Sequence, residues 1–341
     1  MSEIQRQFHI PALDGWRGLA ILIVLTGHFG GYRVLPDLAP TGVNLFFVLS
    51  GRLMAEILFV RKTPLGPFFF HRFSRVYPGL LAFVVVTSIA LSQTSLGPGI
   101  AGAVSALTFT LNYVTIESNR FVSVFDNIWS LCVEEHSYLL LAIVALLFRN
   151  VAIRTIGFII LALGLAALAN GVLQYDVYGQ NWFVVFWPTH VAAAPIMMSA
   201  AIFLLFRKHL DRPAMQWIVP LAFFGGLVTC LFDDAAWIFF GVKTLLLAIA
   251  VCAVEFSTEF SRALFEGAII RKIGRMSFSL YIWQQPFYIA AIKGLLSQPL
   301  ALALGVSCGA ISFYLIEQPA RTRLNGWIGR RGTQGAITVA S

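Results

Sequence analysis

Charge is scarce in this sequence, because Asp, Glu, Lys and Arg together make up only 12% of the 341 residues. A soluble protein of this length carries about a quarter of its residues as charged side chains. Hydrophobic residues reach 58%, and apolar runs of roughly 17–25 residues, the length that crosses a bilayer core, recur along the chain. The composition excludes an ordinary soluble domain and predicts an all-α, polytopic membrane helical bundle.

Cysteine is also rare, and its placement argues against metal or disulfide chemistry. The four cysteines lie within apolar runs without metal-ligand spacing, so we predict small core residues: Cys132, Cys230, Cys252 and Cys308. No bound metal or cofactor is expected. Linkers and internal repeats are missing too, so residues 1–341 are expected to form a single domain with a polar, basic tail over about 325–341. The polar first sixteen residues and the lack of a cleavage site predict a retained helix over 17–33.

The sequence has eleven apolar runs, near 17–33, 42–60, 77–94, 98–114, 129–148, 153–173, 183–206, 214–231, 235–255, 276–295 and 298–317. The fourth run is weak, since it is rich in glycine and hydroxyl side chains. If this run does not span, 18 of the 24 basic residues fall on the cytoplasmic side. If it does span, only six do, which violates the positive-inside rule.

We therefore predict about ten transmembrane helices and one re-entrant or half-buried outer helix. Both termini are expected in the cytoplasm and the chain in the inner membrane of the cell. The net charge of +8 is explained by this topology, and no nucleic-acid partner is expected.

Two ionisable residues stand eleven positions apart in the first run, Arg17 and His28. Eleven residues return to within about 20° of the same helix face and rise about 16 Å, so both lie on one stripe. Ionisable side chains inside a bilayer are costly and are functional candidates by default. An imidazole is a ready base near neutral pH. His28 is either a general base or a packing residue that bonds to a neighbouring helix.

Further arginines lie in the second apolar run and just after it. Arg52 stands four residues before Glu56 on one helix face, which favours an internal ion pair. Arg72 and Arg75 are three apart and point the same way on a helix. Their planar guanidinium groups suit phosphate oxygens, although arginines at a cytoplasmic boundary also occur as topological markers.

For other ionisable residues in the apolar runs, the sequence predicts a role less specifically. Glu134 and Tyr138 can share the helix face of Trp129. Glu317 stands among arginines and is favoured as a pairing group for a basic site. Lys243 requires a partner, and a structural role is favoured for it.

Five stretches, in order along the chain, resemble the integral-membrane type-3 acyltransferase family of bacterial O-acyltransferases. They are LDGWRGLAILIVLTGH, GVNLFFVLSG, RFSR, WSLCVEEHSYLL and IEQPAR. On this resemblance we predict His28 and Glu134 as catalytic residues. The predicted acyl-coenzyme A-binding residues are Arg17, Arg72 and Arg75. The predicted supporting residues are Asn44, Trp129, Ser130, Tyr138 and Glu317.

The sequence departs from the family pattern in two places. The family usually has Asp or Glu at the position of Asn44, which puts a charged role there in doubt. It often has Trp-His-x-Pro near the end, where this chain reads Trp283-Gln284-Gln285-Pro286, so a second catalytic histidine is excluded there. The extracytoplasmic hydrolase-like domain that some members carry is not expected.

The resemblance implies an enzyme that moves an acyl group, often acetyl, from cytoplasmic acyl-coenzyme A to a hydroxyl. The implied acceptor is a surface or exported carbohydrate or a glycolipid. Two other classes would also explain ionisable residues in the apolar runs: a secondary transporter, and a structural or lipid-binding membrane protein. A transporter typically has internal symmetry and broken helices, and no two halves of this chain resemble each other.

Overall fold

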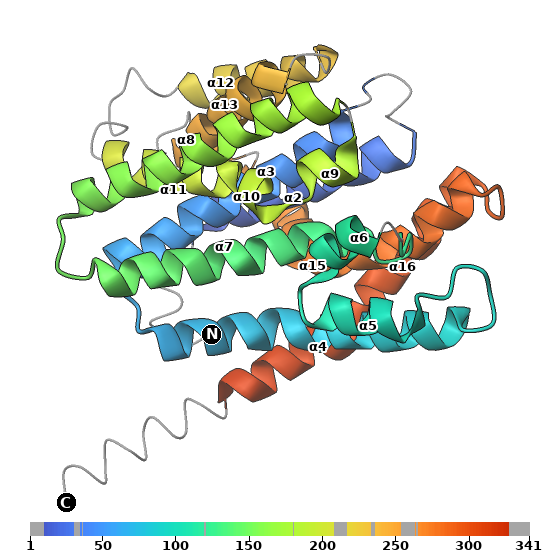
Figure 1. Cartoon of the computed structure of the whole chain (residues 1–341). Helices are drawn as coiled ribbons and strands as arrows, with labels where there is room; N and C mark the ends of the chain where they lie inside the picture. The colour runs from blue at the N-terminus through green and yellow to red at the C-terminus, as the bar shows by residue number, and fades with distance from the viewer. Residues whose placement is uncertain are drawn as a thin grey trace, which may run out of the picture. The chain divides into compact units, whose positions relative to one another are not determined.

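The computed structural model describes residues 10–30, 35, 37–118, 121–179, 181–207, 217–232, 236–253, 263 and 265–326. Every regular element among them is a helix (Figure 1), which confirms the all-α prediction. Six helices of this part are long and apolar enough to cross a membrane: Leu38–Val60, Leu65–Leu91, Ile128–Leu147, Ile153–Tyr178, Thr189–Phe206 and Gln298–Gly326. A multi-pass chain is therefore supported, while the count of ten spans stays a prediction.

The chain divides into two compact units that interleave in sequence. The first comprises Met1–Lys62, Phe109–Arg120 and Ile128–Ser277, and the second Thr63–Thr108, Phe121–Asn127 and Phe278–Ser341. Neither unit is a continuous segment, so the division does not replace the prediction of a single domain over 1–341. Each unit is described by itself below.

The first unit contains most of the helices. They are α2 (Pro11–His28), α3 (Leu38–Met54), η2 (Ala55–Val60), α6 (Leu111–Ser118), α7 (Ile128–Leu147), α8 (Ile153–Tyr178), α9 (Trp182–Phe186), α10 (Thr189–Ala192), α11 (Ala194–Phe206), α12 (Ile218–Val228), η4 (Thr229–Leu231), η5 (Ile238–Lys243), α13 (Thr244–Cys252) and the start of α15 (Ala268–Ile292). Two of these, η2 and η5, are π-helical segments that continue into or out of an α-helix, and η4 is a 3₁₀ turn at the end of α12.

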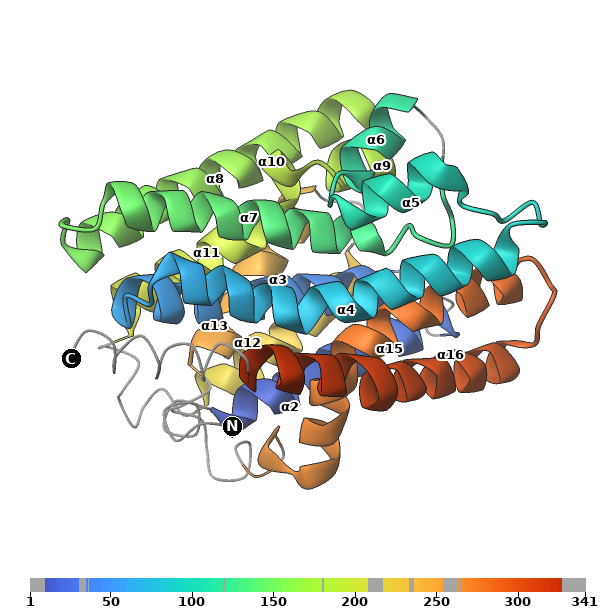
Figure 2. The same ribbon diagram turned by 90° about the horizontal axis from the view of Figure 1, so that it is seen from below.

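Helices α2 and α3 pack closely because glycine lies at their interface. A Cβ atom at Gly27 would collide with the backbone of Ala39, and one at Gly42 would lie 2.6 Å from Val24 Cγ2. Small residues allow such close approach between membrane helices. The two helices lie side by side in Figure 1, and Figure 2 gives the view from below. This packing fixes the last turn of α2 against the first turn of α3.

The second unit is built on three long helices: α4 (Leu65–Leu91), the later part of α15, and α16 (Gln298–Ser312) with its continuation η7 (Phe313–Glu317). The last helix runs on to Gly326. Glycine again permits close contact, since a Cβ atom at Gly309 would lie 2.9 Å from the Cα atom of Leu280. The predicted tail begins at Asn325, which lies in the last described helical turn; residues 327–341 lie outside the described residues.

The weak fourth run is split into two short helices, α5 (Gly99–Leu107) in the second unit and α6 in the first. Phe109, between them, has a positive φ of 56°. Helices of nine and eight residues rise only about 14 Å and 12 Å at 1.5 Å per residue. Neither can cross a bilayer core of about 30 Å, in agreement with the prediction that this run does not span.

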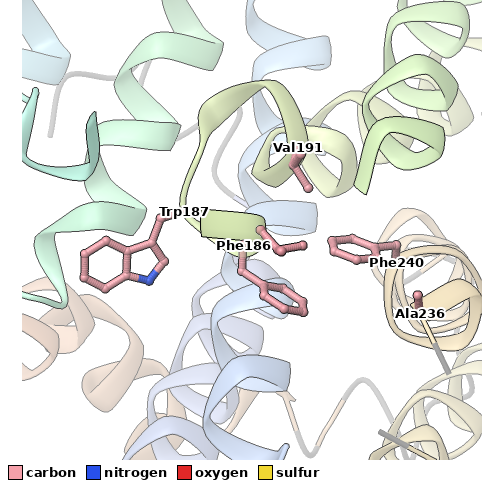
Figure 3. Packing of buried hydrophobic residues seen from close by; sticks show 6 residues of the cluster. Phe186, Trp187, Val191, Ala236 and Phe240 are labelled. Carbon is pink, nitrogen blue, oxygen red and sulfur yellow. The ribbon is translucent and has the colours of Figure 1, made fainter. Parts of the chain in front are cut away.

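A hydrophobic cluster holds the short helices α9 and α10 in the first unit. Its buried members are Val185, Phe186, Trp187, Val191, Ala236 and Phe240. The rings of Phe186 and Phe240 stack with centroids 5.0 Å apart, whereas Trp187 points away from Phe240 (Figure 3). Trp187 is thereby available to contact α7.

Candidate active site

Helix α2 carries the predicted stripe of Arg17 and His28 in the first unit. Pro11 begins the helix, where its missing N–H costs nothing. Arg17 Nη1 lies 3.3 Å from Asp14 Oδ1, one turn earlier. Arg17, which is predicted to bind the donor, therefore already has a carboxylate beside it.

His28 is the last residue of α2 and is half-buried. It follows Gly27 directly, so the close contact of Gly27 with Ala39 holds the histidine beside the start of α3. Such rigid placement on packed helices is what a catalytic side chain requires.

The start of α3 is fixed in turn by a buried ion pair between Asp37 and Lys243. Thr41 donates to the Asp37 carbonyl at 2.8 Å, and Thr41 Oγ1 and Cys230 Sγ lie 3.0 Å apart. Asp37 is 4% exposed and Lys243 is not exposed at all. This pair supplies the partner that Lys243 was predicted to require, and the structural role of Lys243 stays a prediction.

Glu134 is held by hydroxyl groups from two helices. Ser50 of α3 donates to Oε1 at 2.7 Å, and Tyr138 of α7 donates to Oε2 at 3.4 Å. The carboxylate is therefore oriented on both oxygens. The Tyr138 contact agrees with the predicted shared face. Ser50 lies within the GVNLFFVLSG stretch, but its contact with Glu134 was not predicted.

Trp129 and Ser130 lie in the first turn of α7. The Trp129 ring stacks on Trp187, with centroids 5.8 Å apart and planes inclined by 7°, and meets Phe47 edge-on at 5.9 Å. Ser130 is buried. Trp129 thus joins α7 to α3 and to the loop before α10, which is a packing role.

A polar network next to this tryptophan pair was not predicted. Asn112 of α6 donates to the Trp187 carbonyl at 3.1 Å and to Thr189 Oγ1 at 3.3 Å. Thr189 Oγ1 is also 2.8 Å from His136 Nδ1, and the His136 ring stacks on Tyr113. The network fastens the short helix α6 to α7 and α10. In the sequence, only the polar character of the fourth run pointed to it.

Asn44 connects α3 to α13, because its Nδ2 donates to Thr244 Oγ1 at 3.1 Å. Its Oδ1 is buried and has no hydrogen-bond partner within the described part of the chain. A neutral amide can serve this contact. The contact does not need the charge that the family usually has at this position, and the supporting role of Asn44 in the site stays a prediction.

The predicted ion pair on α3 is confirmed. Arg52 Nη1 lies 2.8 Å from Glu56 Oε2, and Arg61 bonds to the other oxygen of Glu56. The Arg52 guanidinium also lies 4.6 Å from the centroid of the Phe203 ring. With these contacts Arg52 is fully buried.

The other predicted donor-binding residues belong to the second unit. Arg72 and Arg75 are half-buried on α4. Glu317, at the end of η7, accepts a hydrogen bond from Ser279 at 2.7 Å. It also interacts electrostatically with Arg75 and Arg321. Glu317 therefore lies among basic side chains, and its role as a pairing group stays a prediction. Ser279 of α15, which orients it, was not indicated by the sequence.

Three π-helical segments in the described chain each carry an ionisable residue: Glu56 in η2, Lys243 in η5 and Glu317 in η7. π-Helical turns are rare, and they occur frequently at functional sites. The wider turn changes the direction in which the following side chains point. In this protein each π segment presents a charged side chain to a partner on the same or another helix.

Comparison with known proteins agrees with the resemblance found in the sequence. O-acetyltransferase OatA of Staphylococcus aureus strain NCTC 8325 is 24% identical over 351 residues, which cover 92% of this chain and 58% of the relative. OatA of S. aureus strain COL gives the same values. The chain thus spans a little over half the length of these curated relatives. No solved structure gives a significant match. A model of the acyltransferase domain matches residues 10–317, and the chain therefore belongs to the type-3 acyltransferase family.

Proposed function

We propose that this protein is a membrane O-acyltransferase that moves an acyl group, acetyl by analogy with its relatives, from acyl-coenzyme A to a hydroxyl group. The proposed acceptor is a carbohydrate or glycolipid destined for the cell surface. The observation that carries the proposal is His28: it is a half-buried imidazole at the packed end of an apolar helix within the matched acyltransferase domain. Arg17, about three turns earlier on the same helix, supplies a cation for the phosphate end of an anionic donor.

The proposed reaction is a general-base-assisted acyl transfer. His28 removes the proton of the acceptor hydroxyl as its oxygen attacks the thioester carbonyl. The carbon–sulfur bond then breaks, the new ester leaves with the acceptor, and the imidazolium returns the proton to the departing coenzyme A thiolate. Glu134, oriented by Ser50 and Tyr138, is the second proposed catalytic group, and its carboxylate stabilises positive charge as it develops in the site.

The direct test is release of coenzyme A by purified protein in liposomes, with and without acceptor glycan. An acyltransferase releases coenzyme A in proportion to the acceptor added. A transporter or a structural membrane protein releases no coenzyme A, whether or not the acceptor glycan is added, and that result would refute the proposal.

The proposed topology places Arg72 and Arg75 on the cytoplasmic side, where the donor is found. A reporter fused after Asn150 and another fused after Leu210, which lies outside the described residues, should both report cytoplasm. The reason is the excess of basic residues on that side in the ten-span arrangement. The measurement is the paired activity of a cytoplasmic and an extracytoplasmic reporter at each site. An extracytoplasmic signal at either site would mean that the fourth run spans the membrane.

Replacing Arg72 or Arg75 by lysine is expected to weaken donor binding. Lysine keeps the charge and the topological signal but loses the planar fork that bonds phosphate oxygens in pairs. We expect the KM for acyl-coenzyme A to rise by about 10-fold, because a hydrogen bond to a charged group contributes about 1.5–3 kcal/mol.

The matched control is Arg154→Lys, whose guanidinium lies 5.9 Å from the centroid of the Phe158 ring on α8. A lysine ammonium can keep this cation–π contact, so the KM should stay unchanged there. Unchanged donor affinity in both Arg72→Lys and Arg75→Lys would reduce these two arginines to topological markers.

A further inference from the structure

The last helix carries three polar side chains on one face at its end. Glu317, Arg321 and Asn325 are spaced by four residues, and residues at this spacing are neighbours along one side of an α-helix. Arg321 is exposed, whereas Glu317 is buried. The arginine therefore stands between a buried carboxylate and the amide at the helix end.

This face docks on the Arg72–Arg75 segment of α4. Asn325 Oδ1 accepts a hydrogen bond from Ser74 Oγ at 2.9 Å and lies 3.0 Å from His71 Nδ1. One turn before Arg321, Glu317 interacts with both Arg75 and Arg321. Asn325 contacts α4 one turn after Arg321, and Glu317, one turn before it, interacts with Arg75 of α4. Arg321 therefore lies on the helix face that meets this segment of α4.

Positive charge is in excess at this place. Among the described residues of the second unit, the only carboxylates are Asp126 and Glu317. Asp126 follows Phe125, which packs on Phe83, and Phe83 is more than two helical turns along α4 from Arg75. Within the described part of the second unit, Glu317 is therefore the carboxylate that accompanies Arg75 and Arg321. Arginines outnumber carboxylates in this part of the unit, and a local excess of positive charge attracts anions.

We propose that Arg321 is a third donor-binding arginine, which grips the phosphate groups of acyl-coenzyme A together with Arg75, while Glu317 holds both guanidinium groups in position. The inference rests on the proposed function, because it takes acyl-coenzyme A as the anion. Coenzyme A carries a diphosphate and a separate 3′-phosphate, and the paired N–H groups of arginine match such oxygens. Ordering the guanidinium groups before binding lowers the entropy lost on binding.

The test compares Arg321→Gln with Arg323→Gln. Both side chains are exposed arginines of the same helix, but two residues of separation turn Arg323 about 200° away from Arg321. Coenzyme A is the probe, and its Kd is measured by equilibrium titration on purified protein in detergent. We expect Arg321→Gln to raise the Kd by about 10–100-fold, the loss expected for charge-assisted hydrogen bonds. Arg323→Gln should change it by less than about twofold.

Two further variants separate binding from folding. Arg321→Lys keeps the charge and should raise the Kd less than Arg321→Gln does. Glu317→Gln keeps an acceptor for Ser279 but loses the charge that orders Arg75 and Arg321, so its Kd should also rise. A purely structural role for Arg321 would lower the melting temperature without changing the Kd of the folded protein, and that result would overturn the inference.

The outcomes for the two proposals are distinct. If wild-type protein does not bind coenzyme A at all, the proposed function fails. If wild-type protein binds it and Arg321→Gln binds it equally well, only the third arginine is refuted.

Discussion

His28→Asn and His28→Gln are expected to lower turnover by about 10²–10⁴-fold, the usual contribution of a positioned general base. Either amide can keep one hydrogen bond of the imidazole ring, so a packing role would survive the change. Neither amide accepts a proton near neutral pH, so a general base would be lost. The measurement is acceptor-dependent release of coenzyme A by wild-type and variant protein in liposomes.

The control for this experiment is His190→Gln. His190 lies at the start of α10, is exposed, and is 3.0 Å from Gln174 Nε2, so its loss should leave turnover near the wild-type value. Both His28 variants should still bind coenzyme A, which shows that the fold is intact. Near-normal turnover in His28→Asn or His28→Gln would end the catalytic assignment and leave His28 as a packing residue.

Lys243→Met is expected to be the most destabilising single substitution among these predictions. It leaves the Asp37 carboxylate buried without its cation, and breaking a buried ion pair in this way costs about 3–5 kcal/mol. The measurement is thermal unfolding of purified protein in detergent. Lys293→Met, at an exposed lysine, is the control and should melt close to wild type.

A double variant tests whether the effect belongs to the pair. Asp37→Asn together with Lys243→Met removes both charges, so the buried carboxylate of the single variant is gone and much of the lost stability should return. If Lys243→Met melts like the wild-type protein, or if the double variant is as unstable as the two single changes added together, the pair does not stabilise the start of α3 beside His28.

Contacts within one helix could be predicted from the sequence. The pairing of Arg52 with Glu56 follows from their four-residue spacing, because helix geometry alone places such residues side by side. Tyr138 and Glu134 obey the same rule. The stripe of Arg17 and His28 and the common direction of Arg72 and Arg75 were predicted on the same geometric ground.

Contacts between helices could not be predicted in this way. Lys243 needs a buried partner, but Asp37 lies 206 residues away, and helix spacing relates only residues of the same helix. Ser50 is 84 residues from Glu134, and its place in the GVNLFFVLSG stretch does not indicate which side chain it contacts. The same holds for Asn325, which the sequence assigned to a polar tail and which bonds to α4.

The sequence by itself determined that this chain is helical, has apolar helices long enough to cross a membrane and belongs to the type-3 acyltransferase family. It also named the ionisable side chains that lipid makes costly. Run length and charge depend only on composition along the chain, and spacing on one helix depends only on the helical repeat. Tertiary structure alone decided which hydroxyl, amide or carboxylate meets each of those side chains. The physical reason is that the partner of a side chain across an interface depends on how closely the two helices approach. Gly27, for example, lets α2 pack closely on α3. Such an approach depends on the side chains of both helices, which lie far apart in the sequence.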